Sequence, residues 1–470
     1  MIGTWHALGL GLACAGLLAG CTSTHYFTVQ PATSAGACQT AVPERDLLLG
    51  VALSGGGSRA ALFGAAGMEA LAAMRTADGA ALIERISHLS SVSGGSLAAT
   101  YYVLRKPGRD VRVLDADGSL SAPYRSFFAR YRADVSQDFE TSLIWRQLLS
   151  FRWTNTALAA RILAEILGER LYGTARIEDV TAREKAGDSP GLIVNTTLYN
   201  NGRRFAVTTL PAEAFEYDFF QDLERSLRER GRPVDPAPYI RERWKLLRPM
   251  TPLEIGVDAC PAGLPVVVTA SASYPSFIGP VTLKIGDREA YWHAGDGGLY
   301  ENSGAESLLF LYLKQLQARR AKRALIVVFD SSFPFSVGER RLFSDPLPFS
   351  LLNFDHSRVP SIMEERVTTY QALFFRTLQL EGIVPDTTTM NVLVLRHTDA
   401  KWAADLSDLP AVCKNEKEPP GSPEAVRDRI AEIPTRLTLP SECDRQLLTT
   451  AAAKLVAEHQ ATILEFVNRP

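Results

Sequence analysis

Short apolar runs alternate with glycine-rich turns and helical segments in the first part of the chain. Residues 47–53 (LLLGVAL) and 86–92 (ISHLSSV) have the length and apolarity of buried strands, and each leads into a glycine-rich turn. Alanine-rich or mixed helices are predicted directly after them, over 60–74 and 95–104. This order of strand, turn and helix, repeated, is typical of an α/β fold with a mainly parallel central sheet flanked by helices in three layers.

The rest of the chain alternates between helical and strand-like patterns. Bulky apolar residues at helical spacing predict a helical insertion over about 120–190. The charged stretch 217–247 predicts a solvated helical excursion, and long helices are expected at 361–380 and 443–467. These last two belong to a C-terminal helical extension of about 345–470, within one domain spanning 46–470. Further strands are predicted at 192–198, 204–209, 266–269, 324–329 and 391–395.

The N-terminal segment has the pattern of an export signal. Residues 7–20 form an apolar run that is too short to cross a bilayer comfortably as a helix. The run ends in Leu18-Ala19-Gly20-Cys21, which resembles the lipobox of bacterial lipoproteins. The resemblance implies a signal peptide over 1–20, a lipid on Cys21, a flexible tether over 21–45 and, from Thr22, an outer-membrane lipoprotein facing the periplasm or the cell surface. An ordinary signal peptide with an incidental cysteine is the alternative.

Composition and cysteine content narrow the classes of partner. The net charge is -2 and there is no long Lys/Arg run, so nucleic acid is not an expected partner. Export to an oxidising compartment would leave four cysteines for disulfides. We predict the pairs Cys413–Cys443, which would clamp a segment rich in Pro, Glu and Lys, and Cys38–Cys260; free buried thiols are the alternative. The spacing fits no zinc pattern, and no metal or organic cofactor is indicated.

The sharpest local motif is Ser91-Val92-Ser93-Gly94-Gly95, between a predicted strand and a predicted helix. A serine on such a tight turn projects its hydroxyl from the edge of the sheet, as in the G-x-S-x-G elbow of hydrolases. Ser91 replaces the first glycine of that pattern. The alternative is an ordinary Ser/Gly turn that caps a helix.

A second glycine-rich motif, Gly55-Gly56-Gly57-Ser58-Arg59, follows the first strand. Glycines leave amide N–H groups uncovered, and the start of a helix adds the positive end of its dipole. Such a loop can stabilise an oxyanion, and each donor can lower the barrier by about 2.7–4 kcal/mol. Arg59 would either add positive charge nearby or lie in solvent on the first helical turn.

The same glycines also fit a dinucleotide-binding fingerprint, with Gly55, Gly57 and Ala60 in the loop and Asp78 as the ribose acid. We disfavour a nucleotide because Asp78 lies in a Thr-Ala-Asp-Gly turn rather than at the end of a strand.

A third motif, Asp296-Gly297-Gly298, lies far downstream, and the three motifs in this order resemble the patatin-like phospholipase family over about 47–315. The resemblance implies a Ser–Asp dyad, with Ser93 as nucleophile and Asp296 as base, and an oxyanion hole built from Gly55, Gly56, Gly57 and Gly94. It also includes the small-residue and proline segment 270–277 and Asn302, which stands where the family often has an asparagine.

Two other functions remain open at this stage. In chain order, Ser93, Asp330 and His397 would form the triad of an α/β-hydrolase-type esterase, because the last two follow apparent strands. A non-enzymatic lipoprotein scaffold on an inactive hydrolase fold is the other. If the Ser–Asp dyad is correct, the expected substrates are membrane lipids, and the same membrane would hold the lipid anchor. A cluster of large apolar residues is expected to form an interfacial face or lid, or else helical core: Trp145, Leu148, Leu149, Phe151 and Trp153.

Overall fold

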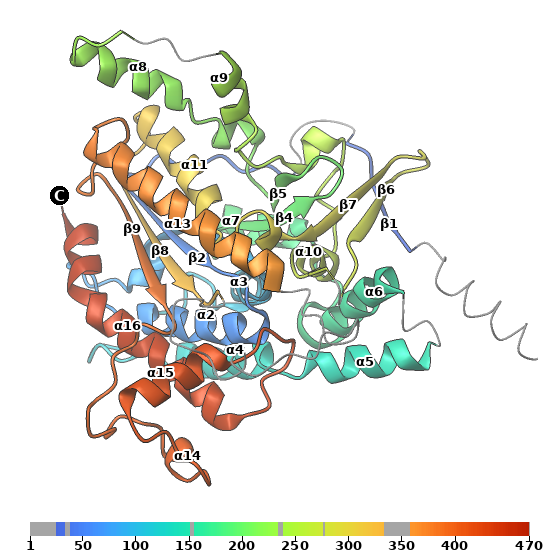
Figure 1. Ribbon diagram of the computed structural model, residues 1–470, viewed down its shortest axis with the longest axis vertical. Helices are drawn as coiled ribbons and strands as arrows, with labels where there is room; N and C mark the ends of the chain where they lie inside the picture. Colours follow the sequence, from blue (N-terminus) through green and yellow to red (C-terminus); the bar gives the residue numbers. More distant parts are fainter. Residues whose placement is uncertain are drawn as a thin grey trace, which may run out of the picture.

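The computed structural model describes residues 25–32, 38–150, 155–233, 238–275, 278–332 and 358–469. Their centre is a nine-stranded sheet with the strand order β1-β6-β7-β4-β3-β2-β8-β9, with β5 paired to β4 off this path (Figure 1). The parallel part of the sheet consists of β2 (Leu47–Leu53), β3 (Ile86–Val92), β4 (Gly191–Leu198), β8 (Arg323–Asp330) and β9 (Met390–Arg396). The expected α/β fold with a mainly parallel sheet is confirmed.

The remaining strands extend one side of the sheet with mixed directions. Antiparallel pairs join β4 to β5 and β7, and β7 to β6, whereas β1 runs parallel to β6. Their bounds are Phe27–Val29 for β1, Arg203–Thr208 for β5, Val281–Ile285 for β6 and Tyr291–Asp296 for β7. The stretch 281–296 was not predicted as strand, because its alternation of apolar and polar residues is short and interrupted by Gly286. The strand β1 lies in the stretch expected to be a flexible tether, so that expectation is wrong for Phe27–Val29.

Helices cover both faces of the sheet because successive residues of a strand point to opposite sides. On β2, Leu49, Val51 and Leu53 enter one apolar core, which also contains residues of α2 (Gly57–Ala72), α3 (Gly94–Arg105) and α16 (Glu442–Asn468). Leu48 and Ala52 enter a second core with α11 (Ala305–Gln317). The long helix α13 (Arg358–Leu380) lies on the same side as α11 in Figure 1. The molecule therefore has three layers.

The predicted helical insertion is present. It consists of α4 (Ala122–Val135), α5 (Phe139–Leu149), α6 (Thr156–Leu167) and α7 (Ile177–Ala186). Local capping explains two of its helix starts, since Asp138 accepts a hydrogen bond from the Thr141 N–H and Asn155 accepts one from the Leu158 N–H. The charged stretch 217–247 contains α8 (Phe219–Glu229) and α9 (Pro238–Lys245), as predicted.

One predicted strand is a helix. Residues 266–269 belong to α10 (Leu264–Ser271), a short buried helix with Pro265 in its first turn. A brief apolar run is compatible with either a buried strand or a buried helix, and the proline favours the start of a helix. This correction matters because the last residue of α10, Ser271, contacts the site described below.

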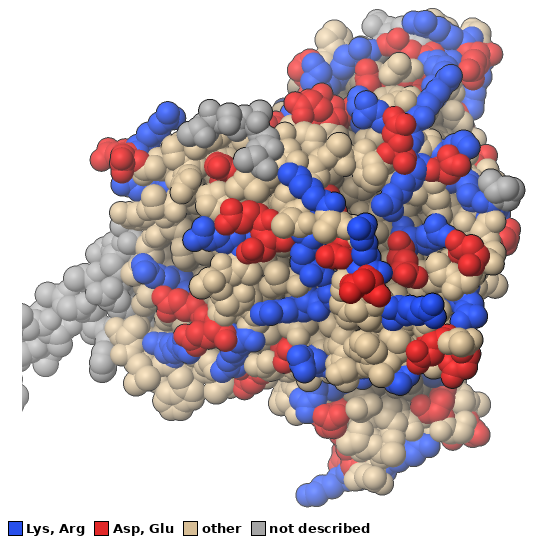
Figure 2. All heavy atoms as spheres, turned by 180° about the vertical axis from the view of Figure 1, so that it is seen from behind, with Lys and Arg blue, Asp and Glu red and all other residues tan. Residues whose placement is uncertain are grey.

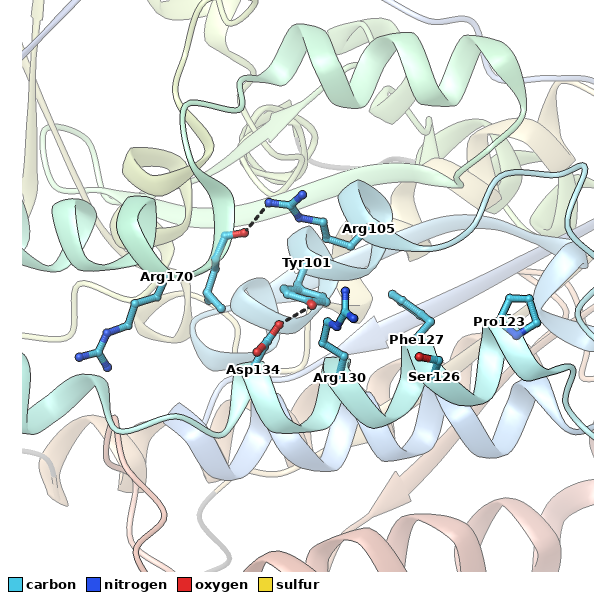
Figure 3. A pocket seen from close by; sticks show the side chains of 9 residues that line it. Tyr101, Arg105, Pro123, Ser126, Phe127, Arg130, Asp134 and Arg170 are labelled. Carbon is cyan, nitrogen blue, oxygen red and sulfur yellow. Dashed lines mark hydrogen bonds between the residues drawn. The ribbon is translucent and has the colours of Figure 1, made fainter.

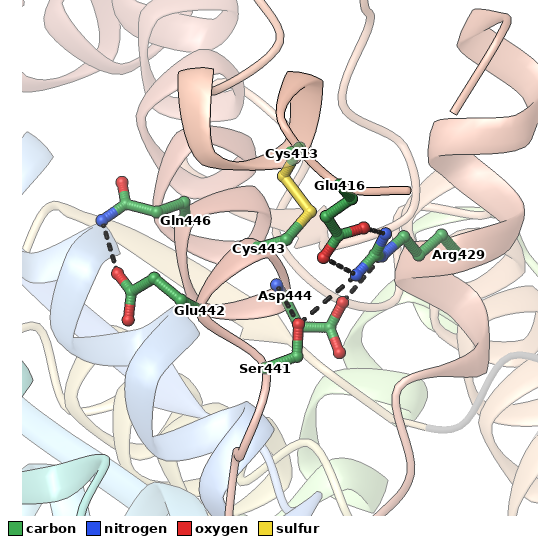
Figure 4. The surroundings of a disulfide bond; sticks show 8 residues. All are labelled: Cys413, Glu416, Arg429, Ser441, Glu442, Cys443, Asp444 and Gln446. Carbon is green, nitrogen blue, oxygen red and sulfur yellow. Dashed lines mark hydrogen bonds and ion pairs between the residues drawn. A yellow bond between two sulfur atoms is a disulfide. The ribbon is translucent and has the colours of Figure 1, made fainter. Parts of the chain in front are cut away.

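Both predicted disulfides are present. Cys38 is bonded to Cys260, and Cys413 at α14 (Ala411–Lys414) is bonded to Cys443 in the first turn of α16. Figure 4 shows the second bond, beside which Arg429 of α15 (Pro423–Glu432) contacts Glu416 and Asp444. The disulfide closes the segment that we expected it to clamp. Cys21 and the predicted signal peptide lie outside the described residues.

Three observations on the described residues bear on the classes of partner. Lys and Arg side chains are mixed with Asp and Glu across the face shown in Figure 2, without a broad region of one sign. No helix in the described ranges combines the length and apolarity needed to cross a bilayer. In the same ranges, no group of three or more His, Cys, Asp or Glu side chains is arranged to hold a metal ion.

Candidate active site

Ser93 occupies a strained turn between β3 and α3. Its backbone angles are φ 51° and ψ -120°, outside the regions that a non-glycine residue normally adopts. The next two residues must be small, since a Cβ at Gly94 would lie 1.9 Å from the Gly57 carbonyl oxygen and one at Gly95 would lie 2.2 Å from that of Leu53. This is the geometry of a nucleophile elbow, in which the serine hydroxyl is exposed at the end of a strand.

Ser91 fits where the usual elbow pattern has glycine. Its side chain is fully buried, donates a hydrogen bond to the Ile193 carbonyl oxygen at 3.2 Å and accepts one from Ser96 Oγ at 3.1 Å. The hydroxyl thus has partners on both sides, and the departure from the pattern leaves the turn intact.

Asp296 is the last residue of β7 and lies directly beside the serine. Ser93 Oγ donates a hydrogen bond to Asp296 Oδ2 at 2.8 Å, and the Gly298 N–H donates one to Oδ1 at 2.8 Å. Only 2% of Asp296 is exposed. Burial raises the pKa of the Asp296 carboxyl to about 6, although the bonds from Gly298 and Ser93 favour the charged form. The serine and the aspartate are thus brought together as the sequence predicts.

The glycine loop lies next to this pair. Gly56 and Gly57 have φ values of 137° and 63°, which glycine adopts without the strain of a side chain, and Gly57 begins α2. The close approach of Gly94 to Gly57 places the loop against the first turn of α3. Among the described residues, the N–H groups of Gly56, Gly57 and Gly94 have no hydrogen-bond acceptor. No acceptor from the described residues therefore competes for these three donors.

Gly55 differs from the expectation. Its N–H donates to the Asn302 carbonyl oxygen at 2.9 Å, so this donor is already used and cannot serve an oxyanion in the same arrangement. The Asn302 side chain fills the space beside it, because a Cβ at Gly55 would lie 2.0 Å from Asn302 Oδ1 and one at Gly298 would lie 2.7 Å from the same atom. Asn302 is thus wedged between the glycine loop and the turn after Asp296.

A polar network behind the elbow was not predicted from the sequence. The Ser93 N–H donates to Ser271 Oγ at 2.9 Å, and that hydroxyl donates to the Asn195 carbonyl oxygen at 2.6 Å. Ser96 Oγ lies 2.8 Å from Ser271 Oγ, and Asn195 Nδ2 donates to the Ser91 carbonyl oxygen at 3.0 Å. These bonds join β3, β4, α3 and α10, and no local motif could have revealed them.

Arg59 is not a solvated residue of the first helical turn, although that was one of its two expected states. Its side chain is fully buried, and its guanidinium donates to the carbonyl oxygens of Ser331 and Ile433 and to Thr435 Oγ1. These contacts join the start of α2 to the residue after β8 and to the segment before α16. Positive charge near the loop remains present, but its donors bind main-chain and hydroxyl oxygens of the protein.

The residues of the alternative triad are not brought together. His397 is fully buried, its Nδ1 lies 3.3 Å from the Asp330 carbonyl oxygen, and its ring packs against Phe63. The Asp330 carboxylate instead accepts a hydrogen bond from Arg396 Nε at 3.0 Å. Burial lowers the pKa of His397 well below its ordinary value. His397 therefore lies in a packed region without contact to the Ser93 hydroxyl.

The geometry does not favour a dinucleotide site either. Asp78 lies in a turn, where it accepts hydrogen bonds from Thr76 Oγ1 and the Ala80 N–H and pairs with Arg85. These are local bonds that stabilise the turn.

A small apolar pocket of about 10 Å³, which we call the groove, lies over Ser93. Beyond the elbow and the glycine loop, the side chains that line it come from α3, α5 and α6, from the end of α10 and from the segment before α16: Leu97, Phe139, Leu163, Leu167, Ala272 and Leu437. These walls suit an apolar acyl group, but the space between them holds at most about one water molecule, so an acyl chain can enter only if the lining segments move apart.

Two larger cavities lie elsewhere. One of about 370 Å³, shown in Figure 3, lies between α3, α4 and the turn Gly168–Tyr172, where Tyr101 donates to Asp134 and Arg105 donates to the Leu171 carbonyl oxygen. The other, of about 570 Å³, is lined in part by His88 near the start of β3. Neither is lined by Ser93, Asp296 or the glycine loop.

A model of the family Patatin-like phospholipase matches residues 51–309 of this chain. The chain belongs to this family. The match includes all three motifs of this patatin-like protein and ends inside α11. It confirms the resemblance that the motifs indicated.

Comparison with solved structures gives distant similarities. Human GIVD cytosolic phospholipase A2 is 12% identical, with a TM-score of 0.46, over 91% of this chain and 60% of that one. VipD from Legionella pneumophila is 11% identical, with a TM-score of 0.32, over 89% of this chain and 67% of that one. The patatin-like chain thus spans about three fifths of the length of the human enzyme. No curated protein matches its sequence.

Proposed function

We propose that the protein is a serine lipid acyl hydrolase, a carboxylic ester hydrolase of phospholipase A type, with Ser93 as nucleophile and Asp296 as base. The observation that carries the proposal is the 2.8 Å hydrogen bond from Ser93 Oγ to Asp296 Oδ2 at a strained elbow. Membership of the patatin-like phospholipase family supports the reaction class.

The proposed reaction has two stages. Ser93 Oγ attacks the ester carbonyl carbon while its proton passes to Asp296 Oδ2, and the oxyanion accepts hydrogen bonds from the amides of Gly56, Gly57 and Gly94. The intermediate collapses to an acyl-enzyme, and the leaving alcohol takes the proton from Asp296. Water then attacks the acyl carbon and gives a proton to Asp296, and the tetrahedral intermediate releases the fatty acid as Ser93 Oγ takes that proton back.

Burial of Asp296 supports its role as base. An ordinary carboxylate is weakly basic, whereas burial raises the pKa of Asp296 to about 6. A pKa nearer to neutrality improves proton abstraction while the group still ionises at physiological pH.

The anchor and the substrate are parts of the same proposal. The apolar side chains that line the groove over Ser93 support an ester with an apolar acyl group. Lipidation of Cys21, predicted from the lipobox, would hold the enzyme at the outer membrane on its periplasmic or outer side, where membrane lipids are the available esters. The lining of the groove does not distinguish phospholipid from neutral lipid.

Active-site labelling tests the proposal. A fluorophosphonate probe should react with the wild-type protein and not with Ser93→Ala, and Ser93→Ala should release no fatty acid from a panel of phospholipids and neutral lipids. Labelling that persists in Ser93→Ala would contradict the assignment. A wild-type protein that neither reacts nor hydrolyses any lipid would favour the non-enzymatic scaffold.

A further inference from the structure

One face of α5 exposes large apolar side chains to solvent. We call it the α5 ridge, and its members are 50–70% exposed: Ile144, Trp145, Leu148 and Leu149. They follow the i, i+3, i+4 spacing that places residues on one side of a helix. A contiguous exposed apolar face on a globular protein marks a surface that contacts another apolar phase or a partner.

The opposite face of the same helix belongs to the groove over Ser93. Phe139, the first residue of α5, is buried and lines that groove, and Leu143 is buried one turn later. The helix α6, which packs against α5, contributes Leu163 and Leu167 to the groove. A single helix therefore has one apolar face toward the site and another toward solvent.

The charges beside the ridge are largely balanced. Arg146 on the flank of α5 pairs with Glu169, at 2.9 and 2.5 Å to its two carboxylate oxygens. Arg161 and Glu165 form an ion pair on the exposed side of α6. Paired charges provide little net attraction to an anionic surface, so the apolar side chains have to supply most of the binding.

We propose that the α5 ridge inserts into the interfacial region of a phospholipid bilayer and sets the groove over Ser93 against the lipid. This inference rests on the proposed lipid acyl hydrolase function. If the groove over Ser93 takes acyl groups of lipids, the lipid has to reach it from a membrane, and the ridge lies on a helix that also lines the groove. Trp145 suits this location, since tryptophan is favoured at the boundary between headgroups and acyl chains. The ridge then selects lipid in a bilayer over an ester dissolved in water.

The test uses the full chain with Cys21→Ser in every arm, so that no lipid anchor contributes. The ridge variant combines Trp145→Gln, Leu148→Gln and Leu149→Gln, which are exposed positions. The matched control carries Tyr239→Gln and Ile240→Gln on α9, where the side chains are 67% and 56% exposed. In Figure 1, α9 lies at the far end of the molecule from α5.

Binding is measured by flotation with phosphatidylcholine vesicles at low and high salt, and activity on those vesicles and on a monomeric short-chain ester. We expect the ridge variant to lose about tenfold or more in vesicle binding and vesicle hydrolysis, because it loses apolar burial, and to keep its activity on the monomeric ester. The control should match the parent, and high salt should leave parental binding in place because it screens only charge interactions.

Several outcomes would overturn the inference. The first two are a ridge variant that binds vesicles as well as the parent does, and a ridge variant that also loses activity on the monomeric ester. The other two are a control variant that loses as much vesicle binding as the ridge variant, and a parent protein that forms dimers which the ridge substitutions abolish. Failure of the proposed function gives a different result. If the parent hydrolyses neither substrate but the ridge variant still loses vesicle binding, the docking surface stands and the enzyme assignment does not.

Discussion

A Cβ atom on Gly94 would lie 1.9 Å from the carbonyl oxygen of Gly57. This contact joins the serine elbow to the glycine loop, two motifs that the chain separates by more than thirty residues. The neighbouring atoms are main-chain atoms, so neither side can yield by rotating a side chain. The relative position of nucleophile and proposed oxyanion donors is therefore fixed by backbone packing.

Gly94→Ala should separate the two motifs. We expect the catalytic rate to fall by about 10²-fold or more, because displaced donors no longer meet the oxyanion, and stability to fall by about 1–3 kcal/mol from overpacking. Steady-state kinetics and thermal unfolding measure both effects. Gly421→Ala is the control, since a Cβ there meets nothing within 4 Å. Equal behaviour of the two variants would refute this reading of the elbow.

Removing the proposed base should reduce the rate without disturbing the alternative triad. We expect Asp296→Asn to lower kcat/KM by about 10²–10⁴-fold, the range for a general base. His397→Gln should retain substantial activity on the folded fraction, because His397 contacts Asp330 and Phe63 rather than Ser93. Circular dichroism checks that each variant is folded. The reverse ranking of the two variants would favour the triad.

The rate should rise with pH as Asp296 ionises. Burial places the pKa of its carboxyl at about 6, and only the carboxylate can accept the proton of Ser93. We therefore expect kcat/KM on a monomeric ester to increase through pH 5–7 and then level off. A rate that is flat over this interval would mean that another group, or the same group with an ordinary pKa, limits the reaction.

The free energy of unfolding should fall as pH rises through an interval that overlaps the one in which the rate increases. The folded pKa of Asp296 is raised from 3.8 to about 6, so the folded state binds more protons than the unfolded state between these values and stability falls as pH rises through them. The loss amounts to at most about 3 kcal/mol above pH 6. Asp296→Asn, which stays neutral, should be more stable than the wild type at pH 8 and lose that advantage at pH 4. Chemical denaturation at both values measures the difference.

Arg59 should prove to be a positioning residue rather than a source of charge for the oxyanion. Arg59→Lys keeps the charge but cannot reach Ser331, Ile433 and Thr435 together, so we expect a loss of about 2–4 kcal/mol of stability and a lower rate. Arg161→Lys at an exposed ion pair should change stability by less than about 0.5 kcal/mol. Unchanged stability in Arg59→Lys would contradict this anchoring role.

The disulfide Cys413–Cys443 should support the site as well as the fold. The segment that it closes includes Ile433 and Thr435, which bind Arg59, and Leu437, which lines the groove. Replacing both cysteines by alanine should lower stability by about 3–4 kcal/mol and also reduce the rate. Replacing Cys38 and Cys260 should lower stability while leaving the rate nearly unchanged at a temperature where the variant is folded. Equal rates in the two variants would contradict a role for the C-terminal segment.

The sequence by itself determined the local elements of the site. Apolar strands that lead into glycine-rich turns, and then into helices, place Ser93 and the loop at Gly56 and Gly57 at one end of a parallel sheet, because such turns depend on residues close in sequence. The order of the three motifs was enough to indicate the family. Trp145, Leu148 and Leu149 were recognised as part of an apolar cluster, but periodicity alone left open whether they were core or surface; Phe151 and Trp153 of the same cluster lie outside the described residues.

Only the tertiary structure decided the rest. The segment 266–269 is helix rather than strand, the Gly55 N–H binds Asn302, Arg59 is buried, and Ser271 and Asn195 hold the elbow from behind. Each depends on residues brought together from distant parts of the chain, as does the Ser93–Asp296 bond across 203 positions. Local pattern encodes which groups can form a turn or a strand, whereas burial and hydrogen-bond partners follow from how the packed layers meet.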